Sequence, residues 1–438
     1  MNPILQSNDQ DEDRQAPAAL PACASEIQVA LLTGGGDRPY AFGMATELIS
    51  KGAVLEMIGG DDLDFPELRG KPNVRFLNLR GDQRTDASFT RKALRILSFY
   101  VKLLLYAASS KPKIFHILWN NKFQLFDRTF LMLLYRLLGK EVILTVHNVN
   151  AATRDSGDSL LNRLTLRTQY LLAAHLFVHT GKMKAALIEE FGVPGARITV
   201  IPFGINNAVP HTNLTASEAK QRLGLESGQK VILFFGNIAP YKGLEFLVSA
   251  FQKSLLEHPE YRLVIAGWPK NCEKYWSEIR ERIREDEREG RILLRADYVP
   301  DEEIEVYFKA ADVLVLPYRY IYQSGVLFLG YSFGLPVLAA DVGVLKDEVV
   351  EGKTGYIFQP EDPTDLMMTI QRYFSSPLYE ELAIRREGIR DYAMEHHSWD
   401  LVGSLTMKVY ADLLQLPLSP GKPTHEISES PLKTKMHC

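Results

Sequence analysis

"KVILFFGNIAPYKGLEFLVSAF" (Lys230–Phe251) contains an apolar run, a glycine loop and the start of a helical pattern. The apolar run does not alternate with polar residues, which is typical of a strand buried on both faces. Such strands belong to parallel sheets that are covered by helices on either side. The stretch therefore predicts a doubly wound α/β unit.

Runs of the same kind recur along the whole chain and alternate with longer helical patterns. In the first half they are "IQVALLTGGG", "VLEMIGG", "VRFLNL", "IFHILW", "EVILTVHN", "LFVHT" and "ITVIPFG". In the second half they are "KVILFFGN", "YRLVIAG", "RILLRADYV", "VLVLPY" and "LPVLAAD". The polar segment 205–220 separates the halves and ends in a helix-start signal at Thr215 or Ser217. With 438 residues, the chain is longer than a domain with a single hydrophobic core usually is. We therefore predict two doubly wound, Rossmann-like α/β domains that face a cleft.

Composition favours an ordinary soluble protein, with 46% apolar and 24% charged residues and a net charge of -4. This charge does not favour nucleic acid as a partner. The three cysteines, Cys23, Cys272 and Cys438, are far apart and predict neither a disulfide framework nor a zinc site. Residues 1–26 and 418–438 are polar and predicted to be disordered tails. The N-terminus is acidic where a signal peptide needs a basic region, so we expect a cytoplasmic protein.

Ligands of open α/β sheets bind beyond the carboxyl ends of the strands, so the loops there are the candidate sites. The first such loop holds Gly34, Gly35 and Gly36, which would let the backbone approach a ligand at a helix N-terminus. Pro39 stands where a dinucleotide fingerprint needs its third glycine, so an NAD site is only weakly indicated. The glycines fit a turn required for packing equally well.

Two further loops of the second half have the pattern of anion sites. Lys242 falls at a loop tip, just before a helix that we expect to begin near Gly243, and could meet a diphosphate. The alternative is a solvated surface lysine. Ser324 and Gly325 would offer free backbone N–H groups at the first turn of an apolar helix (325–333). The alternative is that Ser324 only caps this helix.

His147 ends the apolar run "VILTVHNVN". A histidine at this position would face the cleft and could form hydrogen bonds or titrate near pH 7. A satisfied structural histidine is the other interpretation. The pattern leaves both open.

The segment 91–113, "RKALRILSFYVKLLLYAASSKPK", is a basic and strongly apolar helix pattern. It fits a helix that lies in the surface of a membrane, which would place the protein peripherally on the inner face. It also fits a buried helix of the first domain whose basic side chains (Arg91, Lys92, Arg95 and Lys102) lie at the solvent-exposed edge. Both interpretations stay open.

Together with "VIPFGIN", "YVPDEEIEVYFKAADVLVLPY", "FGLPVLAADVG" and "VVEGKTGYIF", these motifs resemble, in order and spacing, the family 4 glycosyltransferases. The resemblance covers residues 27–417. It implies the GT-B fold, with an acceptor-side domain (27–208), a donor domain (209–385) and C-terminal helices (386–417) that cross back to the first domain. It also implies transfer of a hexosyl group from a nucleotide sugar to a glycan, lipid-linked or small-molecule acceptor. The expected reaction retains the anomeric configuration, needs no cofactor or catalytic metal, and belongs to polysaccharide or glycoconjugate biosynthesis.

The resemblance also implies roles for individual residues. Lys242 matches the lysine that grips the donor diphosphate, and Asn237 stands where the family often has an arginine for the same task. His147 matches a cleft histidine that contacts the transferred sugar, and Gly34–Gly36 match a loop that closes over the phosphates and the acceptor. The remaining donor contacts expected from the resemblance are Gly236 for the phosphates and Gly267, Trp268, Tyr298 and Val299 for the base pocket.

One departure from the family is plain. The pair of glutamates that the family carries before its "GLP" turn corresponds here to Ile321 and Leu329. Either Gln323 and the backbone of Ser324, Gly325 and Val326 replace the carboxylates, or the protein is a non-catalytic assembly or regulatory partner. The presence of Lys242, His147 and the glycine loop favours the first. A nucleotide-sugar epimerase of the same fold would need carboxylates near the sugar, which the missing glutamates disfavour.

Overall fold

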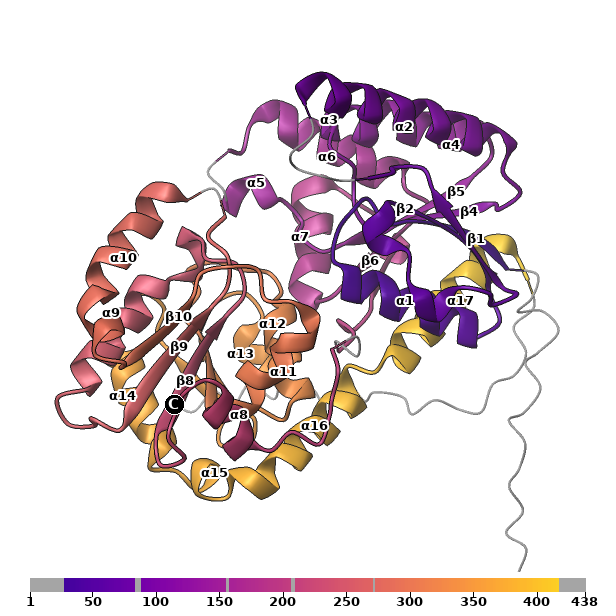
Figure 1. Cartoon of the computed structure of the whole chain (residues 1–438). Helices are drawn as coiled ribbons and strands as arrows, with labels where there is room; N and C mark the ends of the chain where they lie inside the picture. Colours follow the sequence, from indigo (N-terminus) through magenta and orange to yellow (C-terminus); the bar gives the residue numbers. More distant parts are fainter. Residues whose placement is uncertain (1–26, 83–87, 155–156, 206–208, 271, 417–438) are drawn as a thin grey trace, which may run out of the picture.

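The computed structural model describes residues 27–82, 88–154, 157–205, 209–270 and 272–416. Two lobes are each built on a parallel sheet with helices on both faces (Figure 1). All twelve predicted strands are present, which confirms the predicted fold class. The predicted tails, 1–26 and 418–438, lie outside the described residues.

The sheet of the first domain has the order β3-β2-β1-β4-β5-β6-β7, and all its neighbouring strands are parallel. Its central strands are buried along almost their whole length, as the unalternating apolar runs predicted. The strands are β1 (Gln28–Leu32), β2 (Val54–Gly59), β3 (Val74–Asn78), β4 (Ile114–Ile117), β5 (Glu141–Val146), β6 (His175–Val178) and β7 (Ile198–Val200).

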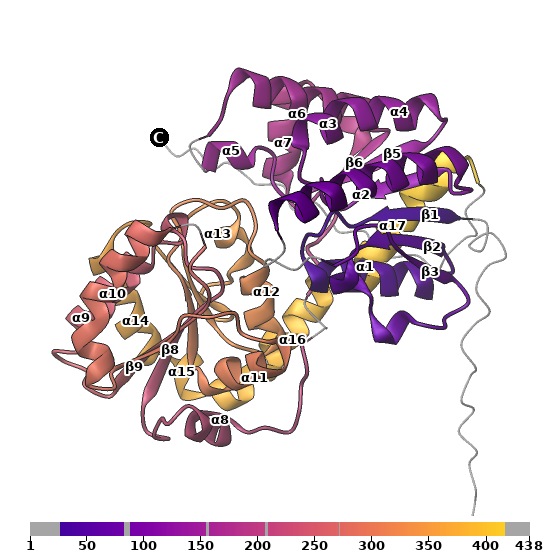
Figure 2. The same ribbon diagram turned by 45° about the horizontal axis from the view of Figure 1, so that its top comes forward.

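Two groups of helices cover this sheet. The helices α2, α4, α6 and α7 pack against one face, and α1 packs with the C-terminal helix α17 against the other (Figures 1 and 2). The helices are α1 (Arg38–Ser50), α2 (Phe89–Ser109), α3 (Gln124–Phe126), α4 (Met132–Leu137), α5 (Ala151–Arg154), α6 (Leu160–Leu172) and α7 (Gly181–Phe191). Short helical turns are η2 (Asp61–Leu63), η3 (Pro66–Leu68), η4 (Asp127–Leu131) and η5 (Gly195–Arg197).

The second domain has a parallel sheet with the order β10-β9-β8-β11-β12-β13. Its strands are β8 (Lys230–Phe235), β9 (Tyr261–Ala266), β10 (Ile292–Arg295), β11 (Val313–Leu316), β12 (Val337–Ala340) and β13 (Gly355–Phe358). The sequence reading did not identify β13 as a strand, because its apolar run is only three residues long and begins after a glycine. Thr215 caps the first helix of this domain in a capping box with Glu218, as the helix-start signal predicted.

The helices of the second domain surround its sheet, and the last two lead back to the first domain. They are α8 (Ala216–Arg222), η6 (Pro240–Lys242), α9 (Leu244–Ser254), α10 (Glu273–Arg288), α11 (Asp301–Ala310), α12 (Gly325–Ser332), α13 (Leu345–Glu348), α14 (Pro363–Phe374), α15 (Pro377–Glu380), α16 (Leu382–His396) and α17 (Trp399–Leu414). Among the helices of the described residues, none combines the length and apolar character that crossing a membrane requires.

Trp399 holds the crossover helix α17 against the first domain. Its indole lies so close to Gly43 of α1 and to Gly204 that a Cβ atom at either glycine would come within 2.1 and 2.4 Å of it. The indole Nε1 donates a hydrogen bond to the carbonyl oxygen of Ile205 at 2.7 Å. Helix α17 begins after Ser398, whose hydroxyl accepts a hydrogen bond from the backbone N–H of Leu401.

We expect Trp399→Ala to lower the free energy of unfolding by about 3–5 kcal/mol, because it empties a tightly packed site. Urea unfolding measures this change. Trp268→Ala is the matched control, since 53% of Trp268 is exposed, and should change stability by no more than about 0.5 kcal/mol. Equal losses in the two variants would contradict the role given to Trp399.

Candidate functional site

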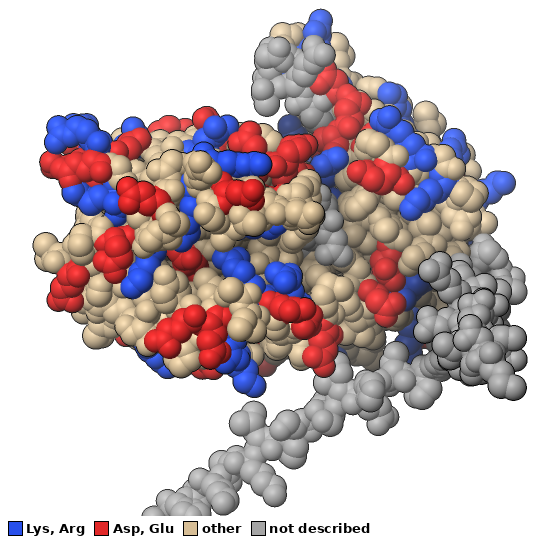
Figure 3. Space-filling model, turned by 60° about the horizontal axis from the view of Figure 1, so that its bottom comes forward, with Lys and Arg blue, Asp and Glu red and all other residues tan. Residues whose placement is uncertain are grey.

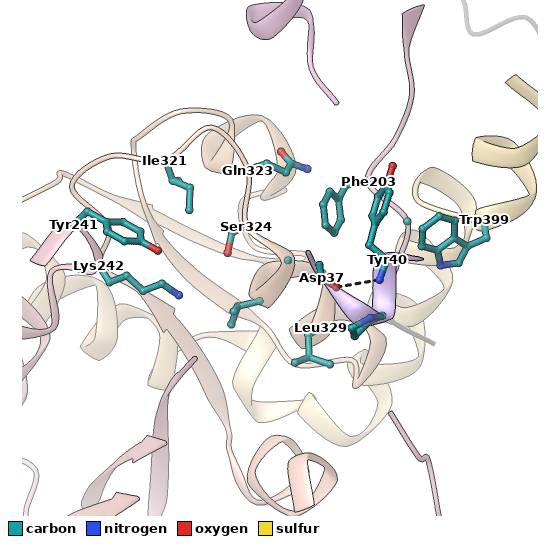
Figure 4. A pocket seen from close by; sticks show the side chains of 14 residues that line it. Asp37, Tyr40, Phe203, Tyr241, Lys242, Ile321, Gln323, Ser324, Leu329 and Trp399 are labelled. Carbon is teal, nitrogen blue, oxygen red and sulfur yellow. Dashed lines mark hydrogen bonds between the residues drawn. The ribbon is translucent and has the colours of Figure 1, made fainter. Parts of the chain in front are cut away.

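A cleft of about 320 Å³ lies between the two domains, at the carboxyl ends of both sheets (Figure 4). Residues of both domains and the first residue of the crossover helix form its walls. The lining residues are Asp37, Pro39, Tyr40, Phe203, Gly204, Tyr241, Lys242, Ile321, Gln323, Ser324, Gly325, Val326, Leu329 and Trp399.

Lys242 is buried in the wall that the second domain contributes, with only 6% of its surface exposed. Lys242 is the last residue of η6. Gly243 follows it with a φ of 64°, and helix α9 begins at the next residue. The Lys242 ammonium donates a hydrogen bond to the hydroxyl of Tyr318 at 3.2 Å and lies 4.9 Å from the centre of that ring. Lys242 is therefore a cleft residue and not a solvated surface lysine.

Helix α12 points its N-terminus into the same cleft. Ser324 occupies the N-cap position, but its side chain makes no capping hydrogen bond. Its hydroxyl lies 3.3 Å from the hydroxyl of Tyr318, the same group that Lys242 contacts. The first turn of α12 is thus left without a side-chain cap, and its N–H groups are available to an anion.

Gly236, at the end of β8, is the point where these elements meet. A Cβ atom there would lie 3.3 Å from the Lys242 ammonium and 3.3 Å from a methyl group of Val326. The φ of Gly236 is 99°, which few residues other than glycine adopt. A backbone turn, a buried cation and a helix N-terminus therefore converge at one end of the cleft, and this combination suits a phosphate or diphosphate.

Gln323 is the neutral polar side chain next to this candidate phosphate site. Both polar atoms of its amide are buried and have no hydrogen-bond partner among the described residues. An unpaired buried amide is unfavourable, so a bound ligand that supplies hydroxyl groups would stabilise it. Ile321 and Leu329, which stand at the positions of the family's glutamates, line the cleft as well.

His147 lies behind the cleft wall and does not line the cleft itself. Tyr40 of α1, which does line it, packs edge-on against the imidazole with 4.7 Å between ring centres. The imidazole stacks on Trp119 at 4.3 Å, and its Nδ1 lies 3.1 Å from Nε2 of His179. Burial, together with His179 and His116, holds the pKa of His147 well below its ordinary value, so the ring is neutral at pH 7.

The loop of Gly34–Gly36 is packed against its neighbours in the first domain. A Cβ atom at Gly34 or Gly36 would overlap the backbone or the ring of Trp119, and one at Gly35 would overlap the guanidinium of Arg80. The structure thus gives these glycines a packing role. The residues that reach the cleft are those that follow them, above all Asp37, whose carboxylate caps α1 by accepting from the backbone N–H of Tyr40 at 3.0 Å.

The residues expected to form the base pocket and Asn237 follow strands β8, β9 and β10 at the same edge of the sheet. None of them lines the cleft. Asn237, Trp268 and Tyr298 are exposed, Val299 is buried, and Gly267 packs directly on the backbone of Gly236. The base-pocket role of Gly267, Trp268, Tyr298 and Val299 and the phosphate-binding role of Asn237 remain predictions.

The cleft also contains residues that the sequence interpretation did not single out. Phe203 follows β7 within the motif "VIPFGIN", and its position after a strand end was the available signal. Tyr318, at the end of the run "VLVLPY", carried the same kind of signal, although it lies buried behind the cleft, where its hydroxyl contacts Lys242 and Ser324. Trp399 carried none, because only the return of α17 to the first domain brings it to the cleft.

Two family models match the chain, one for each domain. The model "Glycosyltransferase Family 4" matches residues 34–209, and "Glycosyl transferases group 1" matches residues 216–394. The D-inositol 3-phosphate glycosyltransferase of Acidothermus cellulolyticus is 29% identical over 246 residues, which are 55% of this chain and 54% of that protein. The mannosylfructose-phosphate synthase of Agrobacterium fabrum is 28% identical over 194 residues, 43% of this chain and 42% of that protein. The chain thus matches about half the length of these relatives, or less.

Solved structures share the whole two-domain architecture at lower identity. A sucrose-phosphate synthase from Thermosynechococcus elongatus superposes with a TM-score of 0.70 and 19% identity, covering 89% of this chain and 99% of that one. The Anabaena protein HepE in complex with UDP and glucose superposes with a TM-score of 0.68 and 16% identity, covering 88% and 99%. With both domains matched by family models and the fold shared throughout, the chain belongs to the family 4 glycosyltransferases and has their GT-B fold.

Proposed function

We propose that the protein transfers a hexosyl group from a nucleotide sugar to an acceptor hydroxyl, with retention of configuration and without a metal or other cofactor. The observation that carries this proposal is the convergence of Lys242 and the N-terminus of α12 at Gly236. This arrangement suits the diphosphate of a nucleotide sugar. The names of the similar proteins, which include glycosyltransferases and sugar-phosphate synthases, support the same class of reaction.

In the proposed reaction, the bond between the sugar C1 and the donor diphosphate breaks, and the acceptor oxygen forms the new bond to C1. Negative charge develops on the diphosphate oxygen as it leaves C1, and this oxygen takes up the proton that the acceptor hydroxyl loses. Lys242 and the N–H groups at Gly325 and Val326 stabilise that charge as it develops. A cation that is already fixed in place needs little reorganisation during the reaction.

The sugar would extend from the diphosphate toward Gln323, whose amide supplies both a donor and an acceptor for its hydroxyl groups. The acceptor would approach from the first domain, where Asp37 and Tyr40 form the facing wall. Candidate acceptors are glycans, lipid-linked sugars and small molecules, in polysaccharide or glycoconjugate biosynthesis.

Lys242→Ala should weaken nucleotide-sugar binding by about 1.5–3 kcal/mol, roughly ten- to 150-fold, because a charge-assisted contact to the diphosphate is lost. Calorimetry with UDP-, GDP- and ADP-sugars measures the affinity. Lys253→Ala, on the exposed side of the next helix, is the control and should bind as the unchanged protein does. Unchanged affinity in Lys242→Ala would refute the diphosphate assignment.

Gln323→Leu should weaken binding of the nucleotide sugar by about 1 kcal/mol, roughly fivefold, and leave binding of the free nucleoside diphosphate unchanged. The difference is expected because Gln323 would face the sugar and not the phosphates. Both ligands are titrated into the same protein, so each serves as the control for the other. A parallel loss for both would place Gln323 at the phosphates instead.

His147→Ala should lower turnover roughly tenfold with donor affinity unchanged, because the imidazole supports the wall that faces the transferred sugar. Since the pKa of His147 lies well below its ordinary value, its protonation does not change between about pH 6 and 8. The pH profile of turnover in that range should therefore have the same shape in the variant. His396→Ala, on an exposed helix end, is the control. A profile that changed shape would show that His147 titrates during turnover.

A non-catalytic GT-B protein is the second candidate, and the apolar side chains of Ile321 and Leu329 in the cleft favour it. A ligand-observed NMR screen of nucleotide sugars identifies the donor, and mass spectrometry then follows transfer and hydrolysis with the donor that binds. Binding without hydrolysis or transfer to any acceptor tested would favour the second candidate. Product formation would establish the first.

A further inference from the structure

Helix α2 carries two opposite apolar faces, and only one of them is covered by the sheet. Phe99, Tyr100, Leu103 and Ala107 are buried against the first domain. On the opposite face Leu94, Leu97, Val101 and Leu105 follow one another at helical spacing, and 67, 62, 47 and 65% of their surfaces are exposed. An amphipathic helix on a domain surface ordinarily presents a polar face to solvent, so a second apolar face is unusual there. The exposed stripe of α2 is therefore a candidate interaction surface.

The neighbouring helices continue the same surface. In both Figure 1 and Figure 2, α2, α4 and α6 lie side by side as one layer over the sheet. Tyr100 of α2 packs edge-on against Phe126 at 5.2 Å, and Arg128 of η4 donates a hydrogen bond to Asn162 of α6 at 2.9 Å. The outward side chains of this layer are again apolar: Phe130, Leu133 and Leu137 on η4 and α4, and Leu160, Leu161, Leu164 and Leu171 on α6.

This concentration is specific to the layer. Fifteen of the exposed large apolar side chains among the described residues lie between Phe89 and Leu171, and the other eight are scattered over the rest of the described chain. Scattered exposed apolar residues are normal, but a contiguous set on adjacent helices marks an interaction surface. We call the outward surface of α2, α4 and α6 the apolar-basic face, because it combines exposed apolar side chains with charges that are almost all positive.

Between Ser88 and Lys140 the chain has ten Lys and Arg residues and one carboxylate, although the whole protein has a net charge of -4. That carboxylate, Asp127, is buried and accepts a hydrogen bond from Tyr100. Arg91, Arg95 and Lys102 run along one edge of the exposed stripe of α2, as their spacing requires. The face seen in Figure 3, which brings the bottom of the Figure 1 view forward, instead mixes acidic and basic side chains.

We propose that the apolar-basic face docks on the surface of a bilayer that contains anionic lipids. Leucine and phenylalanine side chains enter the boundary of the acyl chains, while lysine and arginine meet the lipid phosphates. A symmetric dimer through this face would bring the same cations of two copies together, which is unfavourable. The docking surface does not depend on the proposed sugar transfer, since it lies on the outer side of the first domain.

Flotation of the full chain with vesicles tests the proposal. The protein should float with vesicles of phosphatidylglycerol and phosphatidylcholine in equal amounts and stay behind with phosphatidylcholine alone. The triple variant Leu94→Ser, Leu97→Ser, Val101→Ser should bind at least about tenfold more weakly. The control variant Ile384→Ser, Met394→Ser changes two exposed apolar residues of α16 and should bind as the unchanged protein does.

A second pair of variants tests the charges. Arg91→Glu with Lys102→Glu should weaken binding at low salt by about tenfold, whereas Lys270→Glu with Lys274→Glu, in the second domain, should not. Every variant keeps residues 1–26 and 417–438, so a difference between them reports on the face itself. Circular dichroism confirms that each variant is folded. The proposal would be overturned if the triple variant and its control floated equally well, or if the unchanged protein floated with neither kind of vesicle. It would also be overturned if light scattering showed a dimer that the triple variant abolishes.

Discussion

The side chain of Trp399, wedged between Gly43 and Gly204, is the contact on which the geometry of the cleft depends. The chain passes between the domains twice, once after β7 and once between α16 and α17, and both passages meet at this indole. The hydrogen bond from its Nε1 to Ile205 fixes the first passage to the second. Glycine is required at both neighbouring positions because any side chain would occupy the volume of the ring. Trp399 also lines the cleft, so the same contact forms part of the cleft wall.

Aromatic packing extends from that point into both walls of the cleft. Tyr40 contacts Trp399 at 5.1 Å between ring centres, and Phe203 contacts Tyr40 at 5.2 Å. Phe203 in turn stacks on Phe328 of α12 at 5.4 Å, which sets the position of α12 relative to the first domain. The N-terminus of α12 and Lys242 are thereby held opposite Asp37 and Tyr40. Ion pairs between Arg38 and Asp301 and between Lys182 and Asp347 join the domains beside this packing, but exposed pairs of this kind contribute little.

The first domain presents two surfaces of different character. One face of its sheet is closed by α1 and α17, which join it to the second domain. The other is closed by the layer of α2, α4 and α6, whose outer side remains apolar and cationic. The sequence interpretation offered a buried helix or a membrane-surface helix for residues 91–113, as exclusive alternatives. One face of helix α2 is buried in the domain, as the first interpretation requires. The opposite face exposes apolar side chains beside basic ones, as a membrane-surface helix would.

The sequence by itself determined every described strand except β13, the parallel sheets, and the loops that carry Lys242 and Ser324–Val326. These follow from local rules, since unalternating apolar runs form buried strands and glycines permit the turns that end them. Only the tertiary structure decided that Tyr318 joins Lys242 to Ser324, that the amide of Gln323 has no partner among the described residues, and that Tyr40 stands between His147 and the cleft. The physical reason is that such contacts join residues far apart in the chain, and their geometry depends on how helices pack on sheets and how the two domains meet. No local pattern contains that information.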